Sequence, residues 1–292
     1  MSEAGKPVAP SGRYNRRQLL KRGIRWLGTT SALMGGLGIY AFLGERHWLE
    51  STSVTVRLLR LPVLFQGIRI VHFSDLHLGF FVDAADLQRI CSSIMELQPD
   101  LICFTGDLVD EEPQAAEEAL PLLAALQAPL GKVAVLGNHD VLAGAGPVAE
   151  QLELAGFQVL NNRHVRLERG EATLYVAGVD DVLHGLPDLG QALQGIPADG
   201  CVLLLAHEPD FADEAGQYSV DLQLSGHSHG GQVRLPFGGP ILTPPKGRRY
   251  PDGLRRVAGS PLQVYTNRGT GTTILPIRFF CRPEITLLTL IQ

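Results

Sequence analysis

The chain has 292 residues, of which 45% are hydrophobic, so it can bury a substantial core. Its net charge of -5 provides no basic field for a polyanion, which argues against a nucleic-acid-binding module. The cysteines are far apart and include no C-x-x-C pair, so neither a zinc ribbon nor a dithiol redox motif is present. Cys103 and Cys201 lie in apolar runs and are expected to be buried, and disulfides are not expected.

Residues 1–50 have the layout of an export signal or a membrane anchor. An uncharged segment at residues 26–44 follows a basic block, which consists of Arg13, Arg16, Arg17, Lys21, Arg22 and Arg25. The residues around Arg16-Arg17 resemble a twin-arginine export signal, which implies recognition by the twin-arginine export machinery. No A-x-A cleavage site follows, and the segment is near the roughly 20 residues that span a bilayer, so we expect an uncleaved anchor. The alternative, a soluble amphipathic helix, requires a polar face that residues 26–44 lack.

Residues 51–292 are expected to form the second region of the protein, beginning with an entry strand at residues 54–61. Pairs of a strand and a helix follow at residues 69–73 and 84–97, 101–104 and 114–126, and 132–136 and 147–154. This order predicts parallel strands joined by right-handed crossovers.

The later half of the chain is richer in strands. They are predicted at residues 159–160, 165–167, 173–177, 202–205, 222–224, 232–235, 262–265 and 285–290. We therefore expect a second sheet stacked on the first, with helices on the outside.

Polar residues follow many of these strands directly. The first three polar motifs are about 30 residues apart, which is the length of one β-α-β unit. Open α/β sheets bind their ligands beyond the carboxyl ends of the strands, so these side chains are expected to converge. The set is Asp75, His77, Asp107, Asn138, His139, His207, His227 and His229.

The last two members of this set belong to the motif Gly226-His227-Ser228-His229. In an extended or tightly turned segment, residues two apart project to the same side, so both imidazoles can reach one metal centre. Taken singly, His77 or His207 is more simply a structural histidine, and Asp107 a turn residue or helix cap. The joint occurrence of the set at strand ends favours a metal site.

Carboxylate, amide and imidazole ligands without thiolate suit Mn²⁺, Zn²⁺ or Fe, and a carboxylate such as Asp107 can bridge two ions. Two ions about 3.5–4 Å apart generate hydroxide from bound water and stabilise both oxygens of an in-line displacement. Phosphoryl transfer requires that arrangement because its catalysis is mainly positioning and neutralisation of charge. The competing chemistry is acyl transfer by a Ser-His-Asp triad, but the chain has no G-x-S-x-G elbow.

The chain resembles the calcineurin-like metallophosphoesterase family from about residue 68 to the C-terminus. The motifs that carry the resemblance are Asp75-x-His77, Gly106-Asp107, Gly137-Asn138-His139-Asp140, His207 and Gly226-His227-Ser228-His229. The resemblance implies an α/β fold, a four-layer α/β/β/α metallophosphoesterase sandwich. It also implies two divalent metal ions as cofactors, with Mn²⁺ favoured over Zn²⁺, Fe or a mixed pair.

The resemblance also implies a role for each residue of the set. One ion would be bound by Asp75, His77, Asp107 and His229. The second ion would be bound by Asp107, Asn138, His207 and His227. His139 would lie near the leaving oxygen as a proton donor or transition-state stabiliser, so His139 and Asp107 are the candidate catalytic residues.

A narrower resemblance joins the twin-arginine start to residues 227–235, 249–250 and 281–284. These segments resemble a branch of membrane-associated bacterial phosphodiesterases, which is similar to enzymes that cleave UDP-2,3-diacylglucosamine in lipid A biosynthesis. The branch implies hydrolysis of a phosphodiester or pyrophosphate bond in a lipid-linked or membrane-surface substrate. One alternative is an exported general phosphodiesterase acting on phospholipid head groups, cell-wall diesters or nucleotide diesters. Another is an inactive scaffold, against which the complete ligand set argues.

The loop at residues 235–256 combines basic and apolar residues, so Arg248 and Arg249 are candidate substrate-binding residues. In the alternative interpretation, these arginines pair with acids elsewhere on a solvated surface. The export signal predicts a domain on the extracytoplasmic side of a bacterial inner membrane. Cleavage of a lipid A precursor would instead face the cytoplasm, and the sequence leaves both orientations open.

Overall fold

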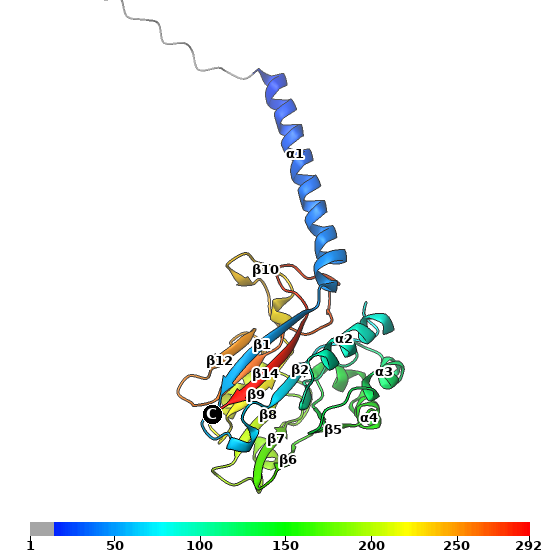
Figure 1. The fold of residues 1–292 in the computed structure, drawn as a ribbon. Helices are drawn as coiled ribbons and strands as arrows, with labels where there is room; N and C mark the ends of the chain where they lie inside the picture. The colour runs from blue at the N-terminus through cyan, green and yellow to red at the C-terminus, as the bar shows by residue number, and fades with distance from the viewer. Residues whose placement is uncertain (1–14) are drawn as a thin grey trace, which may run out of the picture.

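Helix α1, Arg16–Ile39, extends away from the rest of the chain (Figure 1). This computed structural model describes residues 15–292. None of the residues of α1 is buried, and its 24 residues span about 36 Å at 1.5 Å per residue. The helical stretch Arg16–His47 is long and apolar enough to cross a membrane, judged by length and composition alone. It ends in a π-helical turn, Tyr40–Gly44, and a 3-10 turn, Glu45–His47.

The first sheet has six strands in the order β1-β14-β2-β3-β4-β5. Their bounds are β1 Glu50–Arg57, β2 Arg69–Phe73, β3 Leu101–Phe104, β4 Lys132–Ala134, β5 Phe157–Val159 and β14 Glu284–Ile291. Neighbouring strands from β2 to β5 are parallel, as the β-α-β order predicted, and β14 runs antiparallel to β2. The last strand of the chain therefore completes the sheet that the first strands begin.

The second sheet also has six strands, in the order β12-β13-β9-β8-β7-β6. Their bounds are β6 Arg163–Arg169, β7 Ala172–Gly178, β8 Cys201–Leu205, β9 Leu222–Ser225, β12 Gly253–Arg256 and β13 Gln263–Thr266. The four inner strands are parallel, and both edge strands pair antiparallel to their neighbours. A separate hairpin consists of β10, Arg234–Leu235, and β11, Gly239–Pro240.

Helices cover the outer face of each sheet. The first sheet packs against α2 (Ala84–Glu96), α3 (Gln114–Ala124) and α4 (Asn138–Leu154), and the second against α5 (Leu189–Ala192) and α6 (Ala212–Ala215). Helix α2 shows why these segments are helical. Asp83 and Asp86 form its capping box, and Leu87, Ile90 and Ile94 form the apolar face that packs on the sheet.

Three apolar clusters separate the layers. One lies between the first sheet and α2–α4, and one between the second sheet and α5–α6. The third lies between the two sheets and includes Ile70, Leu203 and Leu224. Because both faces of the central strands are covered, β3 and β8 are apolar throughout. The four-layer α/β/β/α sandwich predicted from the sequence is confirmed.

Some predicted elements differ from the observed ones. The third helix starts at Asn138 instead of residue 147, with a kink at Gly144, whose φ of 132° is accessible mainly to glycine. The strand expected at residues 232–235 is only the two residues of β10, and β12 was not predicted. These elements are short and exposed, so they carry little hydrophobic periodicity. The cysteines are free and buried, as expected for Cys103 and Cys201.

Candidate metal centre

The polar strand ends of both sheets meet in one place. Strands β2, β3 and β4 are parallel neighbours in the first sheet, as are β8 and β9 in the second, so their carboxyl ends lie together. The residues placed there are Asp75 and His77 after β2, Asp107 after β3, Asn138 and His139 after β4, His207 after β8, and His227 and His229 after β9. The structure thus brings together the whole set of strand-end residues that the sequence singles out.

The backbone is strained at many of these residues. Asp75, Asp107 and His227 have φ values of 54°, 56° and 67°, and His77 and His229 have values of 48° and 50°. Positive φ is uncommon in residues other than glycine and persists only where the surrounding structure enforces it. Close packing of adjacent backbone segments accompanies these conformations. A Cβ on Gly137 would collide with the Asp107 carboxylate, and a Cβ on Gly226 would collide with the Asp75 carboxylate. The strain turns successive polar side chains towards a common centre.

Asp107 lies between two groups of side chains. One group is Asp75, His77 and His229, and the other is Asp107, His207 and His227. Asp107 Oδ2 is 3.5 Å from Nε2 of His77 and 3.2 Å from Nε2 of His207. A carboxylate within reach of both groups has the position of a ligand shared by two ions. These groups contain the side chains that the resemblance implies as ligands, except Asn138. His77 and Asp107 also form a third group with His139, to which the resemblance gives a catalytic role instead. The role of these residues as ligands stays a prediction.

Two of the histidines are oriented by partners outside the cluster. Nδ1 of His207 donates to the carbonyl oxygen of Thr105 at 2.6 Å, and Nδ1 of His77 donates to the Asp110 carboxylate at 2.9 Å. Each Nε2 is then left with its lone pair directed at the cluster. Nε2 of His207 is buried and makes no hydrogen bond among the described residues, although it lies 3.2 Å from Asp107 Oδ2. Lone pairs and carboxylate oxygens that converge in this way fit a divalent cation.

His227 is oriented in the opposite sense. Its Nε2 donates to the carbonyl oxygen of Pro245 at 2.8 Å, so Nδ1 faces Oδ1 of Asn138 at 2.9 Å as a second acceptor. His229 presents Nε2 at 3.0 Å from Nε2 of His77 and 3.4 Å from Asp75 Oδ1. Burial, together with repulsion from His207, lowers the pKa of His227 to about 4. His227 is therefore neutral at neutral pH, as an imidazole ligand must be.

The electrostatics of the cluster favour positive charge. Burial alone would raise the pKa of Asp107, but attraction to His207 and His77 outweighs it and holds the pKa well below its usual range. Burial alone would lower the pKa of His207, but Asp107 raises it well above the usual range. Both pKa shifts have the same cause, because a positive charge beside the Asp107 carboxylate is electrostatically favourable. The donor set of oxygen and imidazole nitrogen, with no cysteine in it, suits Mn²⁺, Zn²⁺ or Fe.

His139 differs from the other imidazoles because 27% of its side chain is exposed. Its backbone N–H donates to Asp107 Oδ1 at 2.9 Å, which fixes the start of α4 beside the cluster. Its Nδ1 donates to the carbonyl oxygen of Asp110 at 2.9 Å. Nε2 is left to interact with a molecule in the cavity. His139 is thus positioned as a group that contacts a substrate.

Asp110 and Asp140 were not predicted as site residues. Asp110 accepts a hydrogen bond from His77 through its side chain and one from His139 through its backbone. Asp140 accepts from the backbone N–H groups of Leu108 and Gly137 at 2.8 and 3.0 Å, which joins the loops that carry Asp107 and Asn138. Burial and the charge of Asp107 raise the pKa of Asp140 to about 7. The spacing Asp107-x-x-Asp110 was the sequence signal for the first of these residues.

A cavity of about 490 Å³ opens beside the cluster. Asp107, His139 and His229 are among the residues that line it. Its apolar lining includes Val233, Ile241, Leu242, Ile274, Leu275 and Ile277. A cavity of about 670 Å³ at the foot of α1 is larger, but none of the candidate ligands lines it, so its volume does not mark a reaction site.

The structure does not bring Arg248 and Arg249 into this cavity, because neither residue lines it. The Arg249 guanidinium instead forms an ion pair with Asp213 at 2.5 Å. The backbone N–H groups of both arginines donate to the Asp210 carboxylate, which holds their loop against the start of α6. This geometry corresponds to the alternative in which such arginines pair with surface acids.

A family model described as calcineurin-like phosphoesterase matches residues 68–231. An uncharacterized metallophosphoesterase of Bacillus subtilis, YkuE, is 40% identical over 95% of this chain and 98% of its own length. The phosphodiesterase YaeI of Escherichia coli is 30% identical over 93% of this chain and 98% of its own length. The UDP-2,3-diacylglucosamine pyrophosphatase LpxG of Chlamydia muridarum is 27% identical over 84% of this chain and 90% of its own length.

Proposed function

The chain belongs to the calcineurin-like phosphoesterase family, and from this premise we propose that it hydrolyses a phosphodiester or pyrophosphate bond of a lipid-linked substrate at a membrane surface. Membership of the family makes it a metal-dependent phosphoester hydrolase. The finer proposal rests on the cavity, which is lined both by candidate metal ligands and by apolar side chains. A substrate whose phosphate lies next to an acyl chain complements both kinds of lining.

In this proposal, two divalent ions are held by the residues that converge on Asp107, and Mn²⁺ is favoured over Zn²⁺, Fe or a mixed pair. These residues are Asp75, His77, Asp107, Asn138, His207, His227 and His229. When bound, such ions supply a hydroxide at neutral pH and neutralise charge on the phosphoryl oxygens. The protein contributes fixed ligand directions, because Thr105 and Asp110 orient His207 and His77.

His139 is proposed to act on the leaving group. Its Nδ1 proton is engaged with the Asp110 carbonyl oxygen, so Nε2 carries any second proton towards the cavity. A protonated Nε2 within reach of the leaving oxygen neutralises the alkoxide or phosphate that departs. Asp107 fixes this imidazole through the backbone of His139, so the shared carboxylate also sets the position of the acid.

The names of two relatives supply two candidate substrates. The relative from Chlamydia muridarum is named a UDP-2,3-diacylglucosamine pyrophosphatase, and the one from Escherichia coli a phosphodiesterase. The apolar lining of the cavity supports the first, a lipid-linked nucleotide. A general exported phosphodiesterase is the second candidate, which the resemblance of Arg16-Arg17 to an export signal supports.

We further propose that residues 1–50 anchor the protein and that residues 51–292 form the catalytic domain, on the extracytoplasmic side of a bacterial inner membrane. The support is the exposed helix α1, in which basic residues precede the apolar stretch that begins at residue 26, since positive charge is retained on the cytoplasmic side. Protease added to intact spheroplasts should degrade the domain. Protection that is lost only on lysis would place the domain in the cytoplasm.

Turnover by the full chain in mild detergent with Mn²⁺ tests the substrate proposal. UDP-2,3-diacylglucosamine is compared with a water-soluble aryl phosphodiester. A higher kcat/KM for the lipid nucleotide is the expected result. Equal or exclusive turnover of the aryl diester would instead establish the general phosphodiesterase, and loss of activity on chelation is required in either case.

A further inference from the structure

Two irregular segments expose an unusual number of large apolar side chains. Phe237 is fully exposed, and Leu242 and Ile274 are 80% and 86% exposed. We call the whole set the apolar rim, and it comprises Leu235, Phe237, Ile241, Leu242, Ile274, Leu275 and Phe280. Single exposed apolar residues are ordinary, but a group of this size marks a surface that contacts an apolar partner.

The two segments of the rim are joined to each other. The backbone N–H of Arg234 donates to the carbonyl oxygen of Phe279 at 2.9 Å. The side chain of Gln232 both donates to and accepts from the backbone of Thr273, at 2.8 Å in each case. The hairpin β10–β11 and the loop at residues 273–280 therefore form one surface.

This surface is fixed to the end of α1. The backbone N–H of Arg278 donates to the carbonyl oxygen of Ala41 at 3.1 Å, and that of Cys281 donates to the Glu45 carboxylate at 2.5 Å. The rings of Tyr40 and Phe279 lie edge to face with centroids 6.4 Å apart. Figure 1 shows the hairpin and the loop beside the foot of α1, on the side of the domain from which the helix leaves. The rim therefore lies at the level at which α1 would enter a membrane.

Aromatic and cationic side chains also lie near the end of α1. The Arg282 guanidinium lies over the Trp48 ring at 3.6 Å, and that of Arg46 lies over the rings of Phe42 and Phe81 at 4.7 and 5.4 Å. Trp48 and Phe81 are about half exposed. Exposed aromatic rings next to arginine are typical of the boundary between a bilayer and water.

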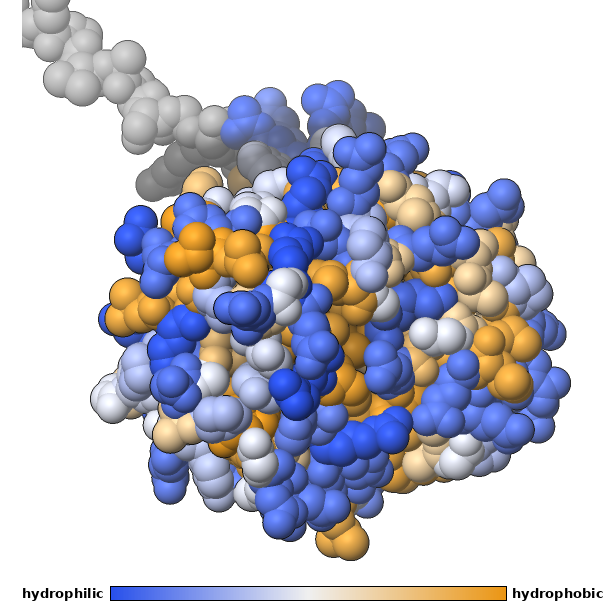
Figure 2. All heavy atoms as spheres, turned by 60° about the horizontal axis from the view of Figure 1, so that its bottom comes forward, coloured by the Kyte–Doolittle hydropathy of each residue, from blue (hydrophilic) through white to orange (hydrophobic). Residues whose placement is uncertain are grey.

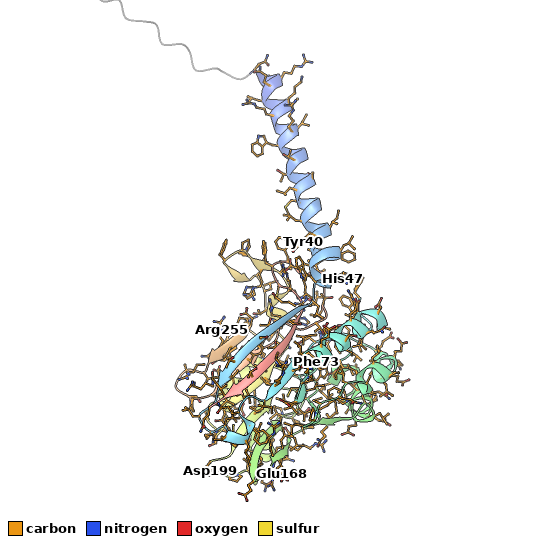
Figure 3. All side chains as sticks on the ribbon, viewed as in Figure 1. Tyr40, His47, Phe73, Glu168, Asp199 and Arg255 are labelled. Carbon is orange, nitrogen blue, oxygen red and sulfur yellow. The ribbon has the colours of Figure 1, made fainter. Side chains whose placement is uncertain are left out.

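The opposite end of the domain differs. Figure 3 places Glu168 and Asp199 there, far from Tyr40 at the foot of α1. Figure 2 turns this lower side forward, and hydrophilic side chains are spread over most of it. Large apolar side chains such as Leu59 and Leu64 are exposed at this end too, but neither lines the cavity of the candidate metal centre, whereas four residues of the rim do.

We propose that the apolar rim inserts into the leaflet of the bilayer that α1 crosses, so that the cavity of the metal centre opens onto lipid. Four rim residues, Ile241, Leu242, Ile274 and Leu275, also belong to the apolar lining of that cavity. The apolar surface is therefore continuous from the bilayer to the candidate ligands. A lipid diffusing in the leaflet enters with its acyl chain along the rim and its phosphate at the metal centre. The entry route rests on the proposed function, whereas insertion of the rim rests on this surface alone.

Immersion of the rim can be measured in the full chain reconstituted into vesicles of phosphatidylcholine and phosphatidylglycerol. The native cysteines are buried, so a nitroxide can be attached selectively at F237C. The matched control is L59C, because Leu59 is 78% exposed and precedes Arg60, which donates to the carbonyl oxygen of Ala198 next to Asp199. The control label thus reports an exposed leucine at the far end of the domain.

The nitroxide at residue 237 should collide readily with oxygen and poorly with a water-soluble nickel chelate, and the nitroxide at residue 59 should do the reverse. Equal access of the nickel chelate to both labels would overturn the proposal. Dipolar broadening at residue 237 that disappears on dilution with unlabelled protein would also overturn it, since a second copy of the chain would then cover the rim.

Activity gives a second readout that separates insertion from catalysis. F237D should raise KM for a lipid pyrophosphate in vesicles by about tenfold, because a charge replaces an aromatic ring at the membrane. Its kcat/KM for the soluble aryl diester should equal that of the L59D control. Loss of both activities in F237D alone would assign Phe237 a structural role and overturn the entry route. Inactivity of the unmutated protein on both substrates would defeat the proposed function, while the nitroxide result would still decide whether the rim inserts.

Discussion

The two walls of the cavity are built differently. The wall from the first sheet consists of polar residues directly after β3 and β4, each followed by a helix that packs on the sheet. The wall from the second sheet consists of the turn after β9 and of the irregular segments between β9 and β14. Regular β-α units fix reacting groups rigidly, whereas irregular segments expose side chains to a partner. The first wall therefore carries the groups proposed to react, and the second determines which molecules reach them.

Removing Asp107 should have the largest effect, because its carboxylate is within reach of both groups of ligands. D107A is expected to lose bound metal and to reduce turnover to the background rate. Elemental analysis of the purified protein and turnover of an aryl diester measure the two effects. D199A, an exposed carboxylate at the far end of the domain, is the control. Full metal content in D107A would show that the first wall does not hold the ions.

H139A should lower kcat by about 10²- to 10⁴-fold while metal content is retained, since an imidazole that donates a proton contributes that much. H164A is a matched control, because Nδ1 of His164 also donates to a backbone carbonyl, that of Ala192 at 2.8 Å. An unchanged kcat in H139A would show that His139 does not act as the proton donor. Loss of metal in H139A would make it a ligand instead.

D110N should weaken metal binding by about 10- to 100-fold, because Asp110 orients His77 without touching the cluster centre. Turnover should fall at limiting metal and return when the metal concentration is raised. Titration of the metal-free protein with Mn²⁺ measures the affinity directly. A loss that excess metal does not restore would contradict a purely orienting role.

The smallest effect on turnover is expected at Glu284, which joins the two walls. Its carboxylate, on β14 of the first sheet, accepts from Tyr265 on the second sheet at 2.6 Å and pairs with Arg268 at 2.8 Å. Burial would raise the pKa of Glu284, but Arg268 and Tyr265 outweigh it and lower the pKa below 4.5. Its stabilising contribution is therefore complete above about pH 4.5 and is lost as the pH falls through the lowered pKa.

E284Q should accordingly unfold more easily at pH 7 by about 1.5–3 kcal/mol, the usual value of a hydrogen bond to a charged group. The difference from the unmutated protein should shrink as the pH falls below 4.5, because the carboxylate becomes protonated. Thermal unfolding in detergent at several pH values measures both. A difference that is the same at pH 3 and pH 7 would show that the charge of Glu284 contributes nothing.

The sequence was most informative where local and tertiary structure coincide. The strands at residues 69–73 and 101–104 are apolar runs that end in Asp75 and Asp107, and the structure confirms both strands and the convergence of the two carboxylates. Helix α4 was placed too late because Gly144 and Pro147 interrupt its pattern. The kink at Gly144 keeps both halves in one element, which a pattern of propensities does not reveal.

The sequence by itself determined the four layers and the convergence of the candidate metal ligands, because strand order and strand ends fix them through β-α-β geometry. Only the tertiary structure decided which side chains orient those residues. The partners of His77 and His207 are Asp110 and a backbone carbonyl, and hydrogen bonds across 33 and 102 residues leave no periodic signal. The tertiary structure also decided that Arg249 forms an ion pair with Asp213, and that the apolar rim lies beside α1. Contacts between irregular segments depend on how the two sheets stack, and no local pattern encodes that.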